Sequence, residues 1–166
     1  MKSHFQMMAK YNRWANARLY QAAAALPDAL YRKDIGLFFK SLHGTLNHIL
    51  TGDRIWMHRL DGKGKSPARL NEIQHEDFGA LRAAREAEDE RILGYAENLG
   101  EGDLDGFLEY TNTRGQSFRD PLWQILPHLF NHQTHHRGQA HTGLSLLTGA
   151  EPPSLDLIWM MREATK

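Results

Sequence analysis

Residues 120–149 read DPLWQILPHLFNHQTHHRGQAHTGLSLLTG, and this stretch predicts the longest helix of the chain. Its first two residues, aspartate and then proline, are typical of a helix start, as a cap and a first helical residue. The helical pattern continues to about Leu147, and a glycine follows its end. Pro127 lies inside the stretch, so a kink or a restart near His128 is expected.

Three further stretches carry apolar residues at helical spacing. A first helix is expected over residues 3–26, where a Ser-x-x-Gln capping box begins it and a leucine-proline pair ends it. A second is expected over residues 37–60, followed by the glycine-rich residues 61–64. A third is expected over residues 75–99 and is rich in mixed charges along its middle.

Two short segments complete the pattern. Residues 104–118 are rich in aromatic residues and threonine around a turn-like Asn-Thr-Arg-Gly, which indicates a short hairpin or an ordered loop before the fourth helix. Residues 155–162 fit a short extra C-terminal helix. No repeat or linker interrupts the chain, so residues 1–166 are expected to form a single domain. The predicted class is all-α, an up-and-down four-helix bundle.

Composition excludes several functional classes. The chain has 166 residues with 20 basic and 20 acidic side chains, so a broad basic surface for nucleic acid or anionic lipid is not expected. No apolar run approaches the roughly 20 residues of a membrane helix, and the start lacks the apolar core of a signal peptide. We therefore expect a cytoplasmic protein without a nucleic-acid or membrane partner. Cysteine is absent, so a bound metal would be held by nitrogen and oxygen.

Five of the ten histidines lie between residues 128 and 141. On a helix, His128, His132 and His136 share one face, and two imidazoles at this spacing can reach one ion. One straight helix cannot easily offer all three, so a further ligand should come from another helix. Spacing alone leaves His132 and His136 equally open to a structural role, because one such pair is expected by chance. His135 points to another side of the helix and is interpreted as a surface residue. His128 is interpreted as a group that contacts and orients a ligand, or as a capping or hinge residue near Pro127.

His48 is the best candidate for the third ligand, because it lies mid-helix beside small residues on a face that could point inward. A histidine hydrogen-bonded to a neighbouring helix is the alternative. Asp53 could orient a ligand, or could pair with Arg54 or Arg137. Three further histidines in this half of the chain, His43, His58 and His75, have no matching pattern and are interpreted as surface residues.

Two known classes of metal enzyme do not fit. Zinc proteases need H-E-x-x-H, in which the glutamate is the general base, but residues 132–136 read HQTHH. Di-iron bundles need two E-x-x-H motifs, and residues 72–75 are the single match.

Two stretches resemble the signatures of a known family. Residues 46–56, LNHILTGDRIW, and residues 131–140, NHQTHHRGQA, are similar to those of the DinB/YfiT-like family of bacterial metal-binding bundles. The resemblance spans nearly the whole chain. It implies an up-and-down four-helix bundle, a frequent homodimer, and a divalent ion, zinc or nickel, held by His48, His132 and His136. Some relatives are metal-dependent transferases or isomerases that use a low-molecular-weight thiol.

Three neutral imidazoles leave a fourth position of the ion open and add no negative charge. The leading hypothesis is therefore a metal-dependent S-transferase, in which the ion activates a small thiol for attack on a small-molecule electrophile. One alternative is a metal-dependent hydrolase, although no general base is evident beside the motif. Another is a non-catalytic metal-binding or stress-response dimer. No catalytic residue beyond the ligands is predicted.

Overall fold

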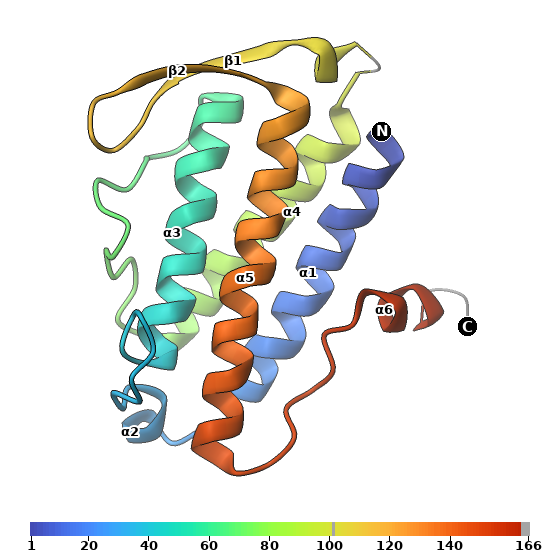
Figure 1. Cartoon of the computed structure of the whole chain (residues 1–166). Coiled ribbons are helices and arrows are strands. Elements are labelled where there is room, and N and C mark those ends of the chain that lie inside the picture. Colours follow the sequence, from blue (N-terminus) through green and yellow to red (C-terminus); the bar gives the residue numbers. More distant parts are fainter. Residues whose placement is uncertain (101, 164–166) are drawn as a thin grey trace.

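Four long helices make up most of the protein (Figure 1). They are α1 (Lys2–Ala24), α3 (Leu42–Asp61), α4 (Phe78–Asn98) and α5 (Leu122–Thr148). The computed structural model describes residues 1–100 and 102–163. In it, α1 and α3 each contact both α4 and α5, so the helices enclose a common interior. The chain is thus mostly helical, as the sequence predicts.

The short elements lie at the ends of these helices. A single turn, α2 (Asp28–Tyr31), follows α1, and a 3-10 turn, η1 (Asp103–Asp105), follows α4. The strands β1 (Phe107–Thr111) and β2 (Ser117–Pro121) pair antiparallel and lie across the ends of α3 and α5 (Figure 1). The short hairpin is therefore confirmed. The last helix, α6 (Leu157–Glu163), lies outside the four long ones.

Two expectations are wrong, the start of the second helix and the restart near His128, and both have local reasons. Helix α3 begins at Leu42 rather than at residue 37, because Ser41 caps it: its hydroxyl accepts from the backbone N–H of Gly44 at 3.1 Å. Just before it, Lys40 takes the left-handed conformation with φ 69°, which helical spacing cannot reveal. Helix α5 runs unbroken past Pro127, so the expected restart is absent. One proline near a helix start removes a single backbone hydrogen bond.

The strict up-and-down alternation is also wrong. One apolar cluster joins the N-terminal halves of α1 and α5 to the C-terminal halves of α3 and α4, and a second joins the opposite halves. Helices α3 and α4 therefore run in the same direction (Figure 1). The reason is the connection of residues 62–77, which is long enough to return along the 20-residue α3, a distance of about 30 Å.

Polar side chains separate the two apolar clusters. They come from all four long helices and are buried: Asn12, Asn16, Asp53, Arg85, Asp89, Gln133 and Arg137. Arg85 donates to Asp53 at 2.5 Å and lies 3.0 Å from Asp89, and Asn12 and Asn16 donate to the same Asp89. We call this set the polar layer. Its two members on α5, Gln133 and Arg137, each follow a histidine of the motif, so the layer lies beside that motif in the helical interior.

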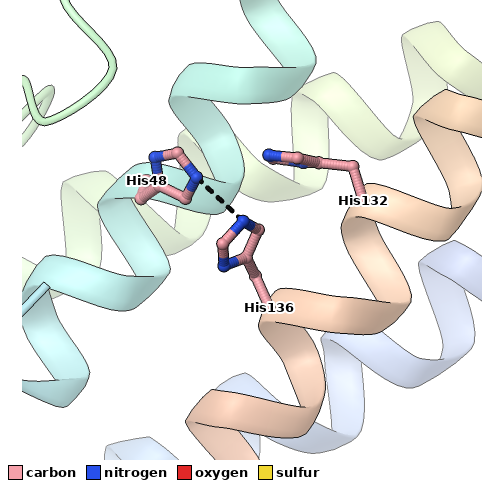
Figure 2. A group of neighbouring side chains, drawn as sticks. All are labelled: His48, His132 and His136. Carbon is pink, nitrogen blue, oxygen red and sulfur yellow. Dashed lines mark hydrogen bonds between the residues drawn. The ribbon is translucent and has the colours of Figure 1, made fainter. Parts of the chain in front are cut away.

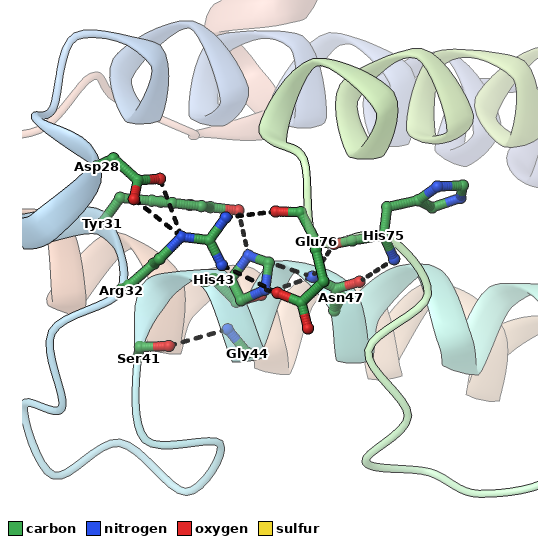
Figure 3. A network of polar contacts seen from close by, with 9 residues as sticks. All are labelled: Asp28, Tyr31, Arg32, Ser41, His43, Gly44, Asn47, His75 and Glu76. Atoms are coloured by element: carbon green, nitrogen blue, oxygen red, sulfur yellow. Dashed lines mark hydrogen bonds and ion pairs between the residues drawn. The ribbon is translucent and has the colours of Figure 1, made fainter.

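The connection of residues 62–77 is held against α3 by side chains that the sequence did not single out (Figure 3). The Asn47 amide donates to the carbonyl of His75 at 3.2 Å and accepts from its backbone N–H at 3.0 Å. At the other end of the same cluster, Arg32 pairs with both Asp28 and Glu76. These contacts fix a segment whose carbonyl groups face α3.

Within the part of the chain that the structure describes, no helix combines the length and the apolar character needed to cross a bilayer.

Candidate metal centre

His48 of α3 meets His132 and His136 of α5 on the face that these two helices share (Figure 2). One nitrogen atom from each of the three rings lies within 4.8 Å of the other two. His48 is buried, and the two histidines of α5 are half-buried. The fold therefore brings together the three histidines that the sequence predicts as ligands, at a spacing that could hold a metal ion.

The tautomer of His48 is set by the connection before α4. Its Nδ1 lies 2.7 Å from the carbonyl oxygen of Leu70, and because a carbonyl can only accept, Nδ1 carries the proton. The lone pair of His48 is then on Nε2, which faces His136. Phe39 stacks on the other side of the ring with centroids 3.8 Å apart, so the ring has little freedom to turn.

His136 is oriented in the same way by its own helix. Its Nδ1 donates to the Gln139 side-chain oxygen at 2.7 Å, which leaves the lone pair on Nε2. The Nε2 atoms of His48 and His136 are 3.1 Å apart. Two lone pairs at this distance repel each other unless a cation lies between them. Two nitrogens bound to one tetrahedral zinc at 2.0–2.1 Å would be about 3.3 Å apart, so this pair fits an ion.

His132 completes the group from one turn earlier in α5. Its buried Nδ1 has no hydrogen-bond partner among the described residues, which is unusual for a buried polar atom. The ring lies against Gly52 of α3, where an added Cβ would come 2.5 Å from the ring carbon Cε1. Gly52 therefore leaves the space that His132 occupies.

All three imidazoles are poised to be neutral. Burial lowers the pKa of His48 to about 4 and the pKa of His132 to about 3, and it also lowers the pKa of His136. The neighbouring histidines contribute to the lowered pKa values of His48 and His132, because a second positive charge nearby is unfavourable. Neutral imidazole is the form that binds metal, so the site needs no deprotonation at pH 7.

No carboxylate belongs to the three-residue group found in the described part of the chain. Asp53 neither orients a ligand nor pairs with Arg54 or Arg137 as predicted: its carboxylate accepts from Arg85 and Gln133. Sequence spacing could not identify Arg85, because the contact joins α3 to α4. An ion held by the three histidines would therefore keep its full positive charge.

The other histidines of the motif lie apart from the group. His135 is exposed, as predicted, and its Nε2 lies 3.3 Å from the Gln139 amide nitrogen. His128 is exposed too, with its ring 6.2 Å from that of His132 and 5.0 Å from that of Trp56. It does not act as a hinge, since the helix is unbroken there.

The interpretation of three further histidines as surface residues is wrong for His43 and only partly right for His58 and His75. His43 is 6% exposed, and its Nδ1 lies 3.2 Å from the hydroxyl of Tyr31 (Figure 3). His58 and His75 are half-buried. The turn α2 folds over the start of α3, a contact that periodicity within α3 does not reveal.

Sequence reasoning missed the groups that position the ligands: Phe39, Gly52, Leu70 and Gln139. One of them left a signal. Gly52 follows His48 by one helical turn, and a glycine inside a helix costs about 1 kcal/mol relative to alanine unless packing requires it. Leu70 left none, because only its backbone carbonyl takes part.

Comparisons with known proteins agree on one family. The family model described as the DinB family matches residues 1–166. The chain is also 27% identical over 135 residues to a protein named Protein DinB from Bacillus subtilis (strain 168), covering 78% of this chain and 77% of that protein.

Proposed function

The chain belongs to the DinB family, and from this premise we propose that it is a metal-dependent S-transferase, whose divalent ion is held by His48, His132 and His136. A divalent ion bound there would lower the pKa of an added low-molecular-weight thiol and hold it as the thiolate. The thiolate would then attack a small-molecule electrophile. The chain has no cysteine, so no thiol of its own competes for the ion.

The observation that carries this proposal is the Nε2 pair of His48 and His136, 3.1 Å apart with both lone pairs facing inward. The donor set is neutral, and a dication in a neutral set favours an anionic fourth ligand. Three protein ligands with an open position are typical of reactive rather than structural zinc. The chain's own residues orient the rings through Leu70 and Gln139 and cover one side with Phe39.

Thiol transfer tests the activity. The metal-loaded protein is incubated with monochlorobimane and, in turn, bacillithiol, mycothiol or glutathione, and the fluorescent conjugate is followed. We expect turnover with at least one thiol, reduced to background by His48→Ala. Turnover that is no faster than that of the His48→Ala variant with every thiol would contradict the proposal.

Metal stoichiometry tests the ligand set separately. We expect one zinc or nickel ion per chain in protein purified without an affinity tag. His132→Ala or His136→Ala should abolish stoichiometric binding, whereas the matched change His135→Ala on the same helix should not. Mass spectrometry of the metal content decides between these outcomes, and a site emptied by His135→Ala alone would refute the assignment.

A non-catalytic role is the second candidate. The three ligands come from two helices, so an ion would join α3 to α5 and stabilise the fold, as in structural metal sites. Strong stabilisation by metal without turnover in any thiol screen would favour this role. Hydrolysis ranks below both, because the metal-ligating group in the described residues contains no carboxylate to act as a base.

We also propose the remaining features that the sequence analysis predicts: a four-helix bundle forming one domain over residues 1–166, a homodimer, and a cytoplasmic location. Exposed apolar side chains support the dimer, since Ile158 and Trp159 of α6 are 51% and 44% exposed. Sedimentation equilibrium should give twice the mass of 19.0 kDa. A monomer at micromolar concentration would contradict the dimer without affecting the metal site.

A further inference from the structure

Arg59, in the last turn of α3, packs against two aromatic rings that also contact each other. Its guanidinium carbon is 4.5 Å from the ring centroid of Trp56 and 4.7 Å from that of Tyr110 on β1. It donates one hydrogen bond, to the carbonyl of Thr111 at 3.3 Å. The charged head is therefore held in a defined place at the point where the hairpin meets α3.

The charge of Arg59 has no acidic partner among the described residues. A guanidinium has five N–H donors, and the Thr111 carbonyl uses one of them. The carboxylate of Asp120 accepts instead from the hydroxyl of Tyr110, at 2.8 Å. On the same hairpin, Arg119 also stacks on a ring, that of Phe107, but it is paired with Glu109. Arg59 thus keeps donors available for an anion.

A row of rings connects Arg59 to the metal centre. The Trp56 ring contacts that of His128 with centroids 5.0 Å apart, and His128 contacts the ligand His132 at 6.2 Å. Trp56 is half-buried and His128 is exposed, so solvent reaches this row. Along α3, Arg59 is two turns beyond Gly52, which lies against His132, so the backbone positions of these two residues are about 10 Å apart along the helix.

We propose that Arg59 binds the carboxylate of the ligand whose other end reaches the metal centre. The site would take an extended, carboxylate-bearing molecule with about 10 Å between its anionic and metal-binding ends, about the length of three extended residues. Its middle lies along Trp56 and His128. The identity of the metal-binding end as a thiol rests on the proposed function, whereas anion binding by Arg59 does not.

Chemistry favours a carboxylate. The planar guanidinium offers parallel N–H groups that match the two oxygens of a carboxylate, and the contacts with Trp56 and Tyr110 hold it in place. If Arg59 only held the hairpin against α3, a different result is expected. Its loss would lower the stability of the protein but would not change how much more tightly an anion binds than a neutral analogue. The following two experiments separate these roles.

The first experiment needs no metal and no thiol. Hexanoate and hexan-1-ol are titrated into the metal-free protein while the indole N–H resonance of Trp56, assigned with Trp56→Phe, is followed by NMR. We expect hexanoate to bind about tenfold or more tightly than the alcohol, the worth of a charge-assisted hydrogen bond. Arg59→Gln should abolish the preference, Arg59→Lys should keep part of it, and the matched control Arg119→Gln should keep all of it. Equal binding, or a preference that survives in Arg59→Gln, would overturn the proposal.

The second experiment joins the two ends in the cobalt-loaded protein. Binding of 8-mercaptooctanoate and of 8-mercaptooctan-1-ol is followed by the thiolate-to-cobalt absorption. We expect about tenfold tighter binding of the acid, and equal binding in Arg59→Gln. If neither thiol reaches cobalt while hexanoate still requires Arg59, the proposed function fails and the anion site stands. If both thiols bind equally in the unmodified protein, the shared ligand is refuted and thiol binding stands.

Discussion

Single atoms decide the geometry of the histidine group. The ring of His132 occupies the space beside Gly52 that a methyl group would fill, and the proton positions of His48 and His136 follow from one acceptor each, Leu70 and Gln139. None of these three contacts is long-range electrostatics; each is a steric or hydrogen-bond constraint on one ring. Small substitutions beside the ligands should therefore alter metal binding without unfolding the protein.

Gly52→Ala tests the steric constraint. The added Cβ would lie 2.5 Å from Cε1 of His132, so the ring must move away from the other two ligands. We expect metal affinity to fall about tenfold or more, because ligand displacement of a few tenths of an ångström already weakens a metal site. Isothermal titration with zinc measures this. Gly138→Ala on α5, where an added Cβ meets nothing within 4 Å, is the matched control and should bind like the unmodified protein.

The low pKa of His48 should appear as pH-dependent stability of the metal-free protein. The folded state keeps this imidazole neutral down to a pKa of about 4, whereas in the unfolded chain it has its ordinary pKa of 6.5. Its contribution is therefore present above pH 6.5 and is lost as the pH falls, by about 2 kcal/mol between pH 7 and pH 5. Urea unfolding in EDTA should show that this loss is smaller in His48→Gln. His135→Gln should lose as much stability as the unmodified protein. If the free energy of unfolding depended on pH identically in all three proteins, the assignment of the low pKa to His48 would be refuted.

At the scale of elements, the polar layer fixes how the four long helices face one another. Arg85 of α4 lies between Asp53 of α3 and Asp89 of its own helix, and Asp89 is in turn held by α1. On α5, Gln133 donates to Asp53, and Arg137 donates to Asn12 of α1. Because His132 and His136 precede these two α5 residues, the layer sets the rotation of α5 that turns both histidines toward α3.

Arg85→Leu should be strongly destabilising. It leaves Asp53 and Asp89 buried without their shared cation, and breaking a buried ion pair on one side typically costs about 3–5 kcal/mol. Arg82→Leu, three residues earlier on the same helix, removes an exposed pair with Glu86 and should cost at most about 1 kcal/mol. Chemical unfolding of the two variants compares them directly. Similar losses for both would mean that the layer contributes little to stability.

At the scale of the whole molecule, the path of the chain determines how a metal would act. The ligands come from α3 and α5, which are far apart in sequence and antiparallel in space. The intervening connection lies along α3, and the hairpin lies across the ends of both helices. An ion bound there would join two sides of the helical interior. Its binding energy would then add to the stability of the fold as a whole.

Metal removal should therefore lower the melting temperature. At a free metal concentration one hundred times the dissociation constant, binding to the folded state adds about 2.7 kcal/mol. For a chain of 166 residues this corresponds to about 5–10 °C. Scanning calorimetry with zinc and with EDTA measures the difference, and His48→Ala should show none. If the protein binds metal stoichiometrically but its melting temperature is the same with and without metal, then the ion does not stabilise the fold by joining α3 to α5.

The sequence by itself determined the helical class, the short hairpin and the identity of the three histidines that meet. Helical periodicity and the spacing of His132 and His136 are local properties. The mid-helix position of His48 made it the best third candidate, and the similarity to a known family implied the same residue. The helical periodicity of the four stretches did not determine the direction in which α4 runs, because an amphipathic helix buries its apolar face equally well in either direction.

Only the tertiary structure decided which groups surround the histidines. Asp53 forms an ion pair with Arg85, and His48 donates a hydrogen bond to the carbonyl of Leu70. The ring of His132 fills the space left by Gly52. Each of these contacts joins segments whose separation along the chain carries no periodic signal, so no pattern within one helix could predict it. The contact of Arg59 with two rings became visible for the same reason: Tyr110 belongs to the hairpin, which reaches α3 only in the folded protein.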